Sequence, residues 1–272
     1  MKIKILQYLL ITVSKTIKVA LGLLVLVTFI SFASASHFTE GLVAWWRFDE
    51  ATGDFLSDSS NNSNNGTLAG NPAWSNDSIA GHALTFDGIN DKVNVVKTSS
   101  VDIVDNVTIE VFIKRNAFLN DEGTIISKNG PYFLAVRNTS VVGGVYANDG
   151  NCPSSCTTPG ANTWTEVRGN RTIPQGKWAR VKLVYNGANL SLHVNGEFVN
   201  SSTKKGQMPQ VSQLVHMGWG EPGHNHYFNG IIDELRIYNI SMDADMMPEI
   251  NLSFPRNNKP LASNLTSPVN FK

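Results

Sequence analysis

A loop rich in short, oxygen-bearing side chains runs from Asp58 to Thr67 and reads DSSNNSNNGT. Carboxylates, side-chain amides and backbone carbonyls are the ligands that a hard cation such as calcium prefers. The spacing is not that of an EF-hand loop, so no metal motif imposes this interpretation. The same residue types also form Asx turns, in which side chains bond the nearby backbone, and that alternative stays open.

A second acidic residue that needs a partner is Asp233, within FNGIIDELRIYN from Phe228 to Asn239. As a strand, this stretch would place Asp233 on one face with Ile231, Leu235 and Ile237, because side chains alternate with a period of two. A carboxylate on a buried face is costly unless it is paired, hydrogen-bonded or bound to a metal. We therefore expect either a cation or backbone amides beside Asp233.

Two long segments carry aromatic and polar side chains suited to a sugar. They are Tyr146 to Val167 and Gly218 to Tyr227, which contains WGEPGHNHY. Aromatic rings stack on sugar rings, and polar groups read the hydroxyls. The alternative is that Trp219 packs in the core and that the histidines only face solvent. Two histidines two residues apart in a Pro/Gly loop are weak evidence for zinc. The candidate ligand-binding residues are Trp164, Trp219, Glu221, His224, His226 and Tyr227.

The elements that would position these residues are short strands joined by turns. Turn signals recur throughout the chain, and Asn186-Gly187 and Asn195-Gly196 are strong hairpin signals. No long stretch has helical periodicity, which favours an all-β, two-sheet antiparallel sandwich. The predicted strands are Leu42–Phe48, Thr67–Leu68, Ala83–Phe86, Val93–Val96, Val107–Lys114, Thr124–Ser127, Tyr132–Val136, Val141–Tyr146, Trp178–Tyr185, Leu190–Val194, Leu214–Trp219 and Tyr227–Tyr238.

Four segments in order give a family resemblance. LVAWWRFDEATG with the Asp58 loop, ALTFDGINDKVNV, KWARVKLVYNGANLSLHVNGEFV and FNGIIDELRIYN together resemble the laminin-G-like branch of the concanavalin A-like lectin/glucanase superfamily, over roughly residues 41–241. The resemblance implies a jelly-roll sandwich, which we assign to residues 37–247. It does not by itself imply a function.

The resemblance also bears on the metal hypothesis, because it places the first loop near the start of the last strand. Asp58 and Asp233 could then share one structural calcium, completed by Asn62 or backbone carbonyls. The family has glycines where this chain has Asn61 and Ser63. Asn tolerates the left-handed conformation better than Ser does, so Ser63 is the larger departure.

No catalytic motif is apparent. The Glu-x-Asp-x-x-Glu pattern of laminarinase-like relatives is absent, as are G-x-S-x-G, P-loop and H-E-x-x-H motifs. The adjacent pairs Asp233-Glu234 and Asp49-Glu50 would point to opposite faces of a strand, so neither could act as a carboxylate pair.

Features outside the strands suggest export. Residues 1–36 have a basic start, an apolar run and an Ala33-Ser34-Ala35 cleavage pattern, so we expect a signal peptide or, alternatively, an uncleaved membrane anchor. Residues 248–272, rich in Pro, Asn and Ser, are expected to form a flexible tail. Cys152 and Cys156, the only cysteines, suit a local disulfide. Asn-x-Ser/Thr sequons begin at Asn61, Asn65, Asn76, Asn106, Asn138, Asn170, Asn189, Asn200, Asn239, Asn251 and Asn264, which are candidate glycosylation sites.

The charge balance narrows the function. Lys plus Arg number 22 and Asp plus Glu number 22, which argues against nucleic acid as a partner. We expect a secreted or cell-surface, non-catalytic module that binds a glycan or an extracellular protein. The membrane would be contacted only through an uncleaved N-terminal segment. Two alternatives remain open: a self-associating structural subunit of an extracellular layer or filament, and a glycoside hydrolase or lyase of the same fold.

Overall fold

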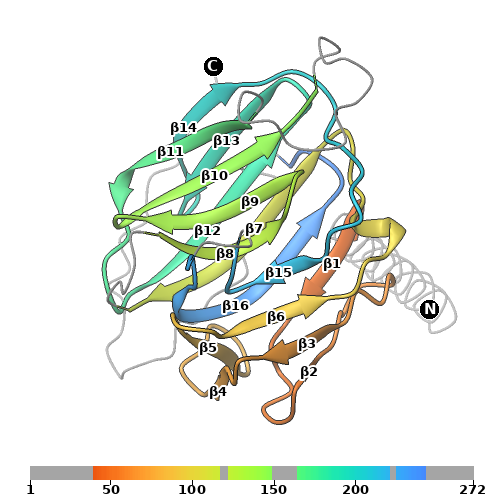
Figure 1. Cartoon of the computed structure of the whole chain (residues 1–272). Helices are drawn as coiled ribbons and strands as arrows, with labels where there is room; N and C mark the ends of the chain where they lie inside the picture. Colours follow the sequence, from red (N-terminus) through yellow and green to blue (C-terminus); the bar gives the residue numbers. More distant parts are fainter. Residues whose placement is uncertain (1–38, 117–121, 149–163, 221–224, 243–272) are drawn as a thin grey trace, which may run out of the picture.

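The computed structural model describes residues 39–116, 122–148, 164–220 and 225–242, which form two facing antiparallel sheets (Figure 1). Sheet A has the order β14 (Glu197–Thr203), β13 (Asn189–Val194), β12 (Trp178–Tyr185), β7 (Val107–Arg115), β16 (Asn229–Tyr238), β5 (Ala83–Asp87) and β4 (Ala73–Ser75), with β1 (Leu42–Trp46) paired to β16. Sheet B has the order β11 (Trp164–Thr172), β10 (Ser140–Tyr146), β9 (Tyr132–Arg137), β8 (Glu122–Lys128), β15 (Val215–Met217), β6 (Lys92–Val95), β3 (Gly66–Ala69) and β2 (Phe55–Leu56). A single short 3-10 turn, η1 (Ser99–Val101), is the one helical element among these residues. The predicted two-sheet sandwich is confirmed.

The core lies between the sheets and follows the predicted alternation. Ala44, Trp46 and Phe48 are fully buried, as expected from the first strand. They belong to the same buried cluster as Leu183 of β12, in sheet A, and Leu134 of β9, in sheet B. In the β13–β14 hairpin, Asn195 and Gly196 both have positive φ, of 53° and 82°, which is the conformation that an Asn-Gly turn favours.

Four strands were not predicted: β2, β4, β11 and β14. The most consequential is β11, because Trp164 to Val167 was expected to belong to a long loop. In the structure, Trp164 pairs with Tyr146 of β10. All four strands lie at sheet edges. Strands β11 and β14 carry many polar side chains, so they lack the apolar alternation that identifies a strand in the sequence. Strands β2 and β4 have only two and three residues, which is too short for an alternation to be recognised.

The predicted side-chain pattern of the last strand is wrong at its centre. Its pairing with β7 shifts register between Asp233 and Arg236, and Glu234 has a left-handed φ of 52°. This bulge reverses the alternation, because one extra residue moves all later side chains to the other face. Ile232 faces the core before the bulge, and Leu235 and Ile237 face it after. Asp233 therefore lies on the outer face of sheet A rather than with Leu235.

The edges of the two sheets meet where β11 and β14 run side by side (Figure 1). Asn200 Nδ2 of β14 donates to the Arg168 carbonyl of β11 at 3.0 Å. Ser202 Oγ of β14 donates to the Glu166 carbonyl at 2.8 Å. Arg171 and Glu197 add an ion pair between the same strands. Side chains of β14 in sheet A thus donate hydrogen bonds to backbone carbonyls of β11, the edge strand of sheet B.

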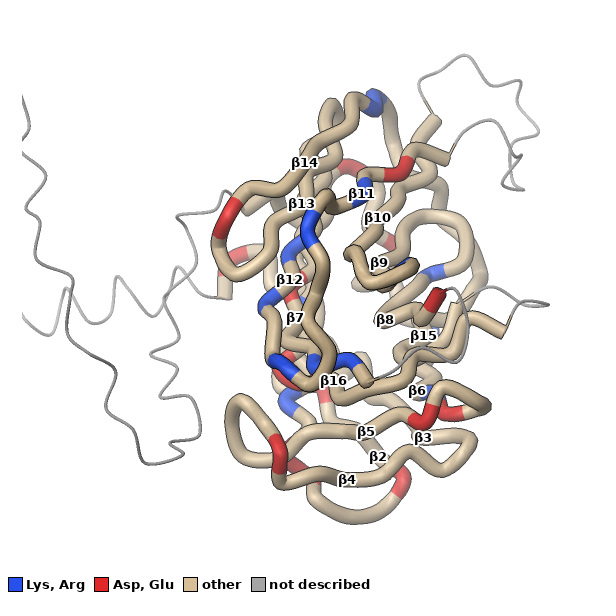
Figure 2. Tube along the Cα trace, turned by 90° about the vertical axis from the view of Figure 1, so that its left-hand side faces the viewer, with Lys and Arg blue, Asp and Glu red and all other residues tan. Residues whose placement is uncertain are grey.

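Basic residues follow β12, β7 and β16 in Figure 2, and several of them have acidic partners. Arg180 pairs with Glu110, and Lys114 pairs with Asp77. Arg236 of β16 pairs with Glu234. These pairs neutralise part of the row.

Several expectations lie outside the described residues. These are the signal peptide or anchor at 1–36, the tail at 248–272, the Cys152–Cys156 disulfide, and the sequons at Asn251 and Asn264. Within the part of the chain that is described, no helix is long and apolar enough to cross a membrane. Of the sequon asparagines in the described ranges, Asn65 and Asn106 are half-buried, and the others are exposed. Glycosylation stays a prediction.

Candidate functional site

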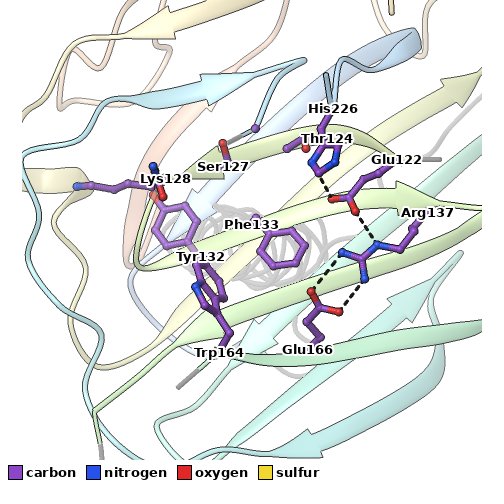
Figure 3. Close-up of a pocket in the computed structure, with 12 residues that line it drawn as sticks. Glu122, Thr124, Ser127, Lys128, Tyr132, Phe133, Arg137, Trp164, Glu166 and His226 are labelled. Carbon is purple, nitrogen blue, oxygen red and sulfur yellow. Dashed lines mark hydrogen bonds and ion pairs between the residues drawn. The ribbon is translucent and has the colours of Figure 1, made fainter. Parts of the chain in front are cut away.

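A cavity of about 210 Å³ opens on the outer face of sheet B (Figure 3). Strands β8, β9 and β11 supply most of its lining, and the segments around Gly220 and His226 complete it. Its lining residues are Glu122, Thr124, Ser127, Lys128, Asn129, Tyr132, Phe133, Arg137, Trp164, Glu166, Gly220 and His226.

The aromatic part of the cavity is set by the pairing of three strands. Gly144 of β10 stands opposite Phe133 of β9 on one side and opposite Glu166 of β11 on the other. Trp164 meets Phe133 edge-on with ring centroids 5.4 Å apart, and it meets Tyr146 at 6.0 Å. Because Tyr146 is only 2% exposed beneath it, Trp164 has a fixed support.

The polar part of the cavity is a chain of three charged side chains. Arg137 Nε donates to Glu122 Oε2 at 2.6 Å. Its two terminal nitrogens donate to the two oxygens of Glu166 at 2.8 and 3.2 Å. The hydrogen bonds to Glu166 raise the pKa of Arg137, with burial opposing them and Glu122 adding to them. Nδ1 of His226 lies 4.0 Å from Glu122 Oε1.

The opposite end of the cavity holds a buried cation and a buried hydroxyl. Lys128, whose side chain is 0% exposed, pairs with Asp102 and donates to the Val101 carbonyl at 3.0 Å. Burial lowers the pKa of Lys128, and the hydrogen bond that Lys128 donates to Asp102 opposes that shift. Tyr132 Oη is buried with no hydrogen-bond partner, and burial raises the pKa of Tyr132. Lys97 pairs with the same aspartate, Asp102, at 3.6 Å, so this end carries two lysines on one carboxylate and one unsatisfied hydroxyl.

The structure brings together only part of the predicted ligand-binding set. Trp164 and His226 line the cavity. Trp219 and Tyr227 form a separate stacked pair next to it, with ring centroids 6.1 Å apart. Lys92 Nζ lies 4.6 Å from the centre of the Trp219 ring, and His216 meets that ring edge-on. Trp219 is half-buried rather than a core residue. Glu221 and His224 lie outside the described residues.

Asp58 is held by donors from its own loop and the first strand. Its Oδ1 accepts from the backbone N–H groups of Trp45 and Ser60 at 2.9 and 2.8 Å. Its Oδ2 accepts from the Ser60 hydroxyl at 2.7 Å and from the Asn64 N–H at 2.8 Å. The amide of Asn62 donates to the Val43 carbonyl at 2.8 Å. The loop thus has the Asx-type bonding of the alternative interpretation, and Ser63 adopts a left-handed φ of 56°.

Asp233 is less completely satisfied. Its Oδ2 accepts from the N–H groups of Ile79 and Ala80 at 2.6 and 3.2 Å, but its Oδ1 is buried without a hydrogen bond. Burial raises the pKa of Asp233 to about 7, and the neighbouring Glu234 charge adds to that shift. Across the same 79–82 segment, Asp49 Oδ1 accepts from the His82 N–H at 3.0 Å.

The two aspartates of the metal hypothesis therefore accept hydrogen bonds from separate donors. No cluster of three or more His, Cys, Asp or Glu side chains suited to a metal occurs within the described ranges. Calcium also binds amide and carbonyl oxygens, so a calcium site does not require three such side chains. A calcium shared by Asp58, Asn62 and Asp233 stays a prediction.

A family model described as the concanavalin A-like lectin/glucanases superfamily matches residues 86–246. The chain belongs to this superfamily. The superfamily match begins at β5, whereas the resemblance extended to the first strand and loop. No curated protein matches the chain significantly.

Solved structures with the superfamily's fold are similar to this one at low sequence identity. Domain 4 of AbnA, a GH43 extracellular arabinanase from Geobacillus stearothermophilus in complex with arabinotriose, is 20% identical with a TM-score of 0.58, covering 75% of this chain and 95% of that one. The botulinum neurotoxin serotype D binding domain is 15% identical with a TM-score of 0.56, covering 75% of this chain. The binding domain of Paraclostridial Mosquitocidal Protein 1 is 14% identical with a TM-score of 0.58, also covering 75%. This chain spans about half the length of the two toxin structures, 49% and 50%. These likenesses show the fold alone.

Sequence reasoning missed the residues that form the centre of this superfamily member's cavity: Glu122, Phe133, Arg137 and Glu166. One signal was present, the Gly143-Gly144 pair inside a predicted strand, because glycine within a strand often marks a close approach of another group. The alternation of Phe133 and Arg137 with core residues Leu134 and Val136 was a second signal.

Proposed function

We propose that this protein is a secreted or cell-surface, non-catalytic module that binds a saccharide in the cavity on sheet B. The observation that carries the proposal is the composition of the cavity. Aromatic rings of Phe133 and Trp164 lie beside a chain of charged hydrogen-bonding groups, Glu122, Arg137 and Glu166. Binding sites for small polar ligands combine apolar and aromatic surface with a few fixed polar groups in this way.

The arabinotriose complex of the structurally similar arabinanase domain supports this choice of ligand class. The match extends over 95% of that domain, so the comparison concerns a whole domain rather than a fragment. At 20% identity the individual contacts do not carry over, and the residues proposed for this chain come from its own cavity.

The arrangement of the carboxylates favours binding over hydrolysis. Glycoside hydrolases of the common two-carboxylate type use one protonated acid and one free carboxylate on either side of the scissile bond. Here Glu122 and Glu166 both bind Arg137, which lies between them. A glycosidic oxygen placed between these two carboxylates would meet the guanidinium instead of a free acid and a free carboxylate.

A glycan array tests the proposal. The full-length mature protein should bind a defined set of saccharides, and Trp164→Ala should lose that binding. Phe198→Ala is the matched control, because Phe198 is an aromatic residue that is 59% exposed on β14 of the other sheet. If Trp164→Ala and Phe198→Ala both bind as the unmodified protein does, the cavity is not the binding site.

A second comparison separates the cavity from the neighbouring stacked pair. Tyr227→Ala removes one ring of the Trp219–Tyr227 pair, which does not line the cavity. Retention of binding in Tyr227→Ala together with loss in Trp164→Ala would assign the ligand to the cavity. The reverse pattern would assign it to the stacked pair and overturn the proposal as stated.

A further inference from the structure

Phe133 lies over a position where the neighbouring strand has no side chain. Phe133 and Gly144 are directly paired across β9 and β10. A methyl group added to Gly144 would overlap the Phe133 ring at Cε1. Gly144 is not among the residues with positive φ, so its backbone does not require glycine. The space above Gly144 is therefore what allows the Phe133 ring to lean toward β10.

The position of this ring makes it the central surface of the cavity. Figure 3 shows Phe133 between Trp164 on one side and the Glu122–Arg137–Glu166 chain on the other. The ring is half-buried, so part of its surface faces the cavity. A sugar ring stacked on Phe133 would present hydroxyls toward the charged chain, where carboxylates accept and the guanidinium donates.

The size of the cavity limits how much of a saccharide it can hold. Its volume is about 210 Å³. Sites for drug-sized ligands measure about 300–1,000 Å³. The cavity is thus suited to a single sugar ring, with any further units of a chain outside it.

The charges of the Glu122–Arg137–Glu166 chain are not balanced. Glu122 and Glu166 each carry a negative charge, and Arg137 supplies one positive charge between them. At the opposite end of the cavity, Lys128 and Lys97 both pair with Asp102 rather than with the glutamates of this chain. A carboxylate on a ligand would be the third carboxylate around one guanidinium.

We infer that the cavity selects a neutral sugar ring, stacked on Phe133, and discriminates against sugars that carry a carboxylate or sulfate. This inference rests on the proposed function and adds the chemical class of the ligand. Gly144 is a specificity-determining residue for the site, because it sets the position of the ring. Glu166 is the second, because its charge opposes an anionic ligand.

The test uses an array that carries neutral glycans beside sialylated, uronate-containing and sulfated glycans, followed by calorimetry. Methyl galactoside with methyl galacturonide, and methyl glucoside with methyl glucuronide, are matched probes that differ only in the carboxylate. The neutral member of a bound pair should bind about tenfold or more tightly than the acidic member, because like charges in contact are strongly unfavourable. In Glu166→Gln this ratio should fall toward one, whereas Glu197→Gln, which changes an exposed glutamate of β14, should leave it unchanged.

Gly144→Ala provides the second arm. Neutral-sugar binding should be lost because the added methyl group displaces Phe133, while the unfolding midpoint and the near-UV spectrum show that the domain remains folded. Phe133→Ala should lose binding as well. If Phe133→Ala loses binding and folded Gly144→Ala binds normally, the role assigned to Gly144 is wrong.

The outcomes separate this inference from the proposed function. Preferential binding of neutral glycans, with the ratio lowered in Glu166→Gln, supports both. Binding of acidic glycans as tightly as neutral ones, lost in Trp164→Ala, overturns the charge selection and leaves the proposed function standing. Binding of no glycan of either class overturns both.

Discussion

The raised pKa of Asp233 predicts that the domain becomes less stable as pH rises through 7. Asp233 is 0% exposed, and its Oδ1 accepts no hydrogen bond. Its pKa is about 7 in the fold, compared with 3.8 ordinarily. Because the folded state holds this proton more tightly than the unfolded state, protonation stabilises the fold. This stabilisation by the proton on Asp233 is complete below about pH 4 and is lost as pH rises through 7.

The magnitude follows from the same two pKa values. A shift of one unit is worth about 1.4 kcal/mol, so a shift of about three units is worth about 4 kcal/mol over the whole range. Between pH 5 and pH 8, the part lost is about 2–3 kcal/mol.

The assay is urea unfolding in chelator at pH 5 and at pH 8, followed by tryptophan fluorescence. The unmodified protein should lose about 2–3 kcal/mol more than Asp233→Asn between these pH values. The asparagine variant still accepts from the Ile79 and Ala80 N–H groups, and its buried NH₂ group adds a cost that does not depend on pH. Asp54→Asn, at an exposed position, is the matched control and should follow the unmodified protein. Equal pH dependence in Asp233→Asn and the unmodified protein would refute the reasoning.

Calcium gives the same experiment a second arm. A cation bound at Asp233 would replace the proton, so added calcium should restore stability most strongly at pH 8. Free calcium at a hundredfold excess over Kd would raise the free energy of unfolding by about 2.7 kcal/mol. If the cation is shared, Asp233→Asn and Asp58→Asn should both blunt the response. A response blunted only in Asp233→Asn would remove Asp58 from the site, and the absence of any response, with no bound metal by elemental analysis, would remove the site itself.

Three further predictions concern the core, the cysteine pair and the N-terminus. In urea unfolding, Trp46→Ala should lower the free energy of unfolding by about 3–5 kcal/mol, because Trp46 is fully buried. Phe55→Ala should change it by about 0.5 kcal/mol or less, because Phe55 is 51% exposed. The native protein, purified without a reductant, should titrate no free thiol, because Cys152 and Cys156 are predicted to be joined; two reactive thiols would contradict this. N-terminal sequencing should find the mature chain beginning near Ser36, whereas retention of the initiating methionine would favour the anchor.

The sandwich was predictable because its central strands bury one face each. The alternation of Ala44 and Trp46 gives both the strand β1 and its inward face, and both residues are fully buried. Phe48 is also buried, but it lies past the end of β1 with a φ of 60°. The Asn195-Gly196 turn was predictable for a local reason, since both residues adopt positive φ. Strand β11 was not predictable, because it buries Val167 and Gly169 and leaves the rest polar and exposed or half-buried.

The candidate site was harder to predict because register brings it together. Glu122, Arg137 and Glu166 come from three strands, and only the pairing of β8, β9, β10 and β11 aligns them. The bulge at Glu234 was hard to predict for a similar reason. The apolar residues of the last strand fit either alternation, and only its pairing with β7 and β1 shows where the extra residue lies.

The junction of β11 and β14 has a consequence for how the domain behaves at high concentration. An open strand edge is a template on which another chain can add a strand. At this edge the carbonyls of Glu166 and Arg168 already accept from Ser202 and Asn200 within the same molecule. A second copy could polymerise here only by first breaking those bonds. The junction therefore protects this strand-rich domain against aggregation through this edge.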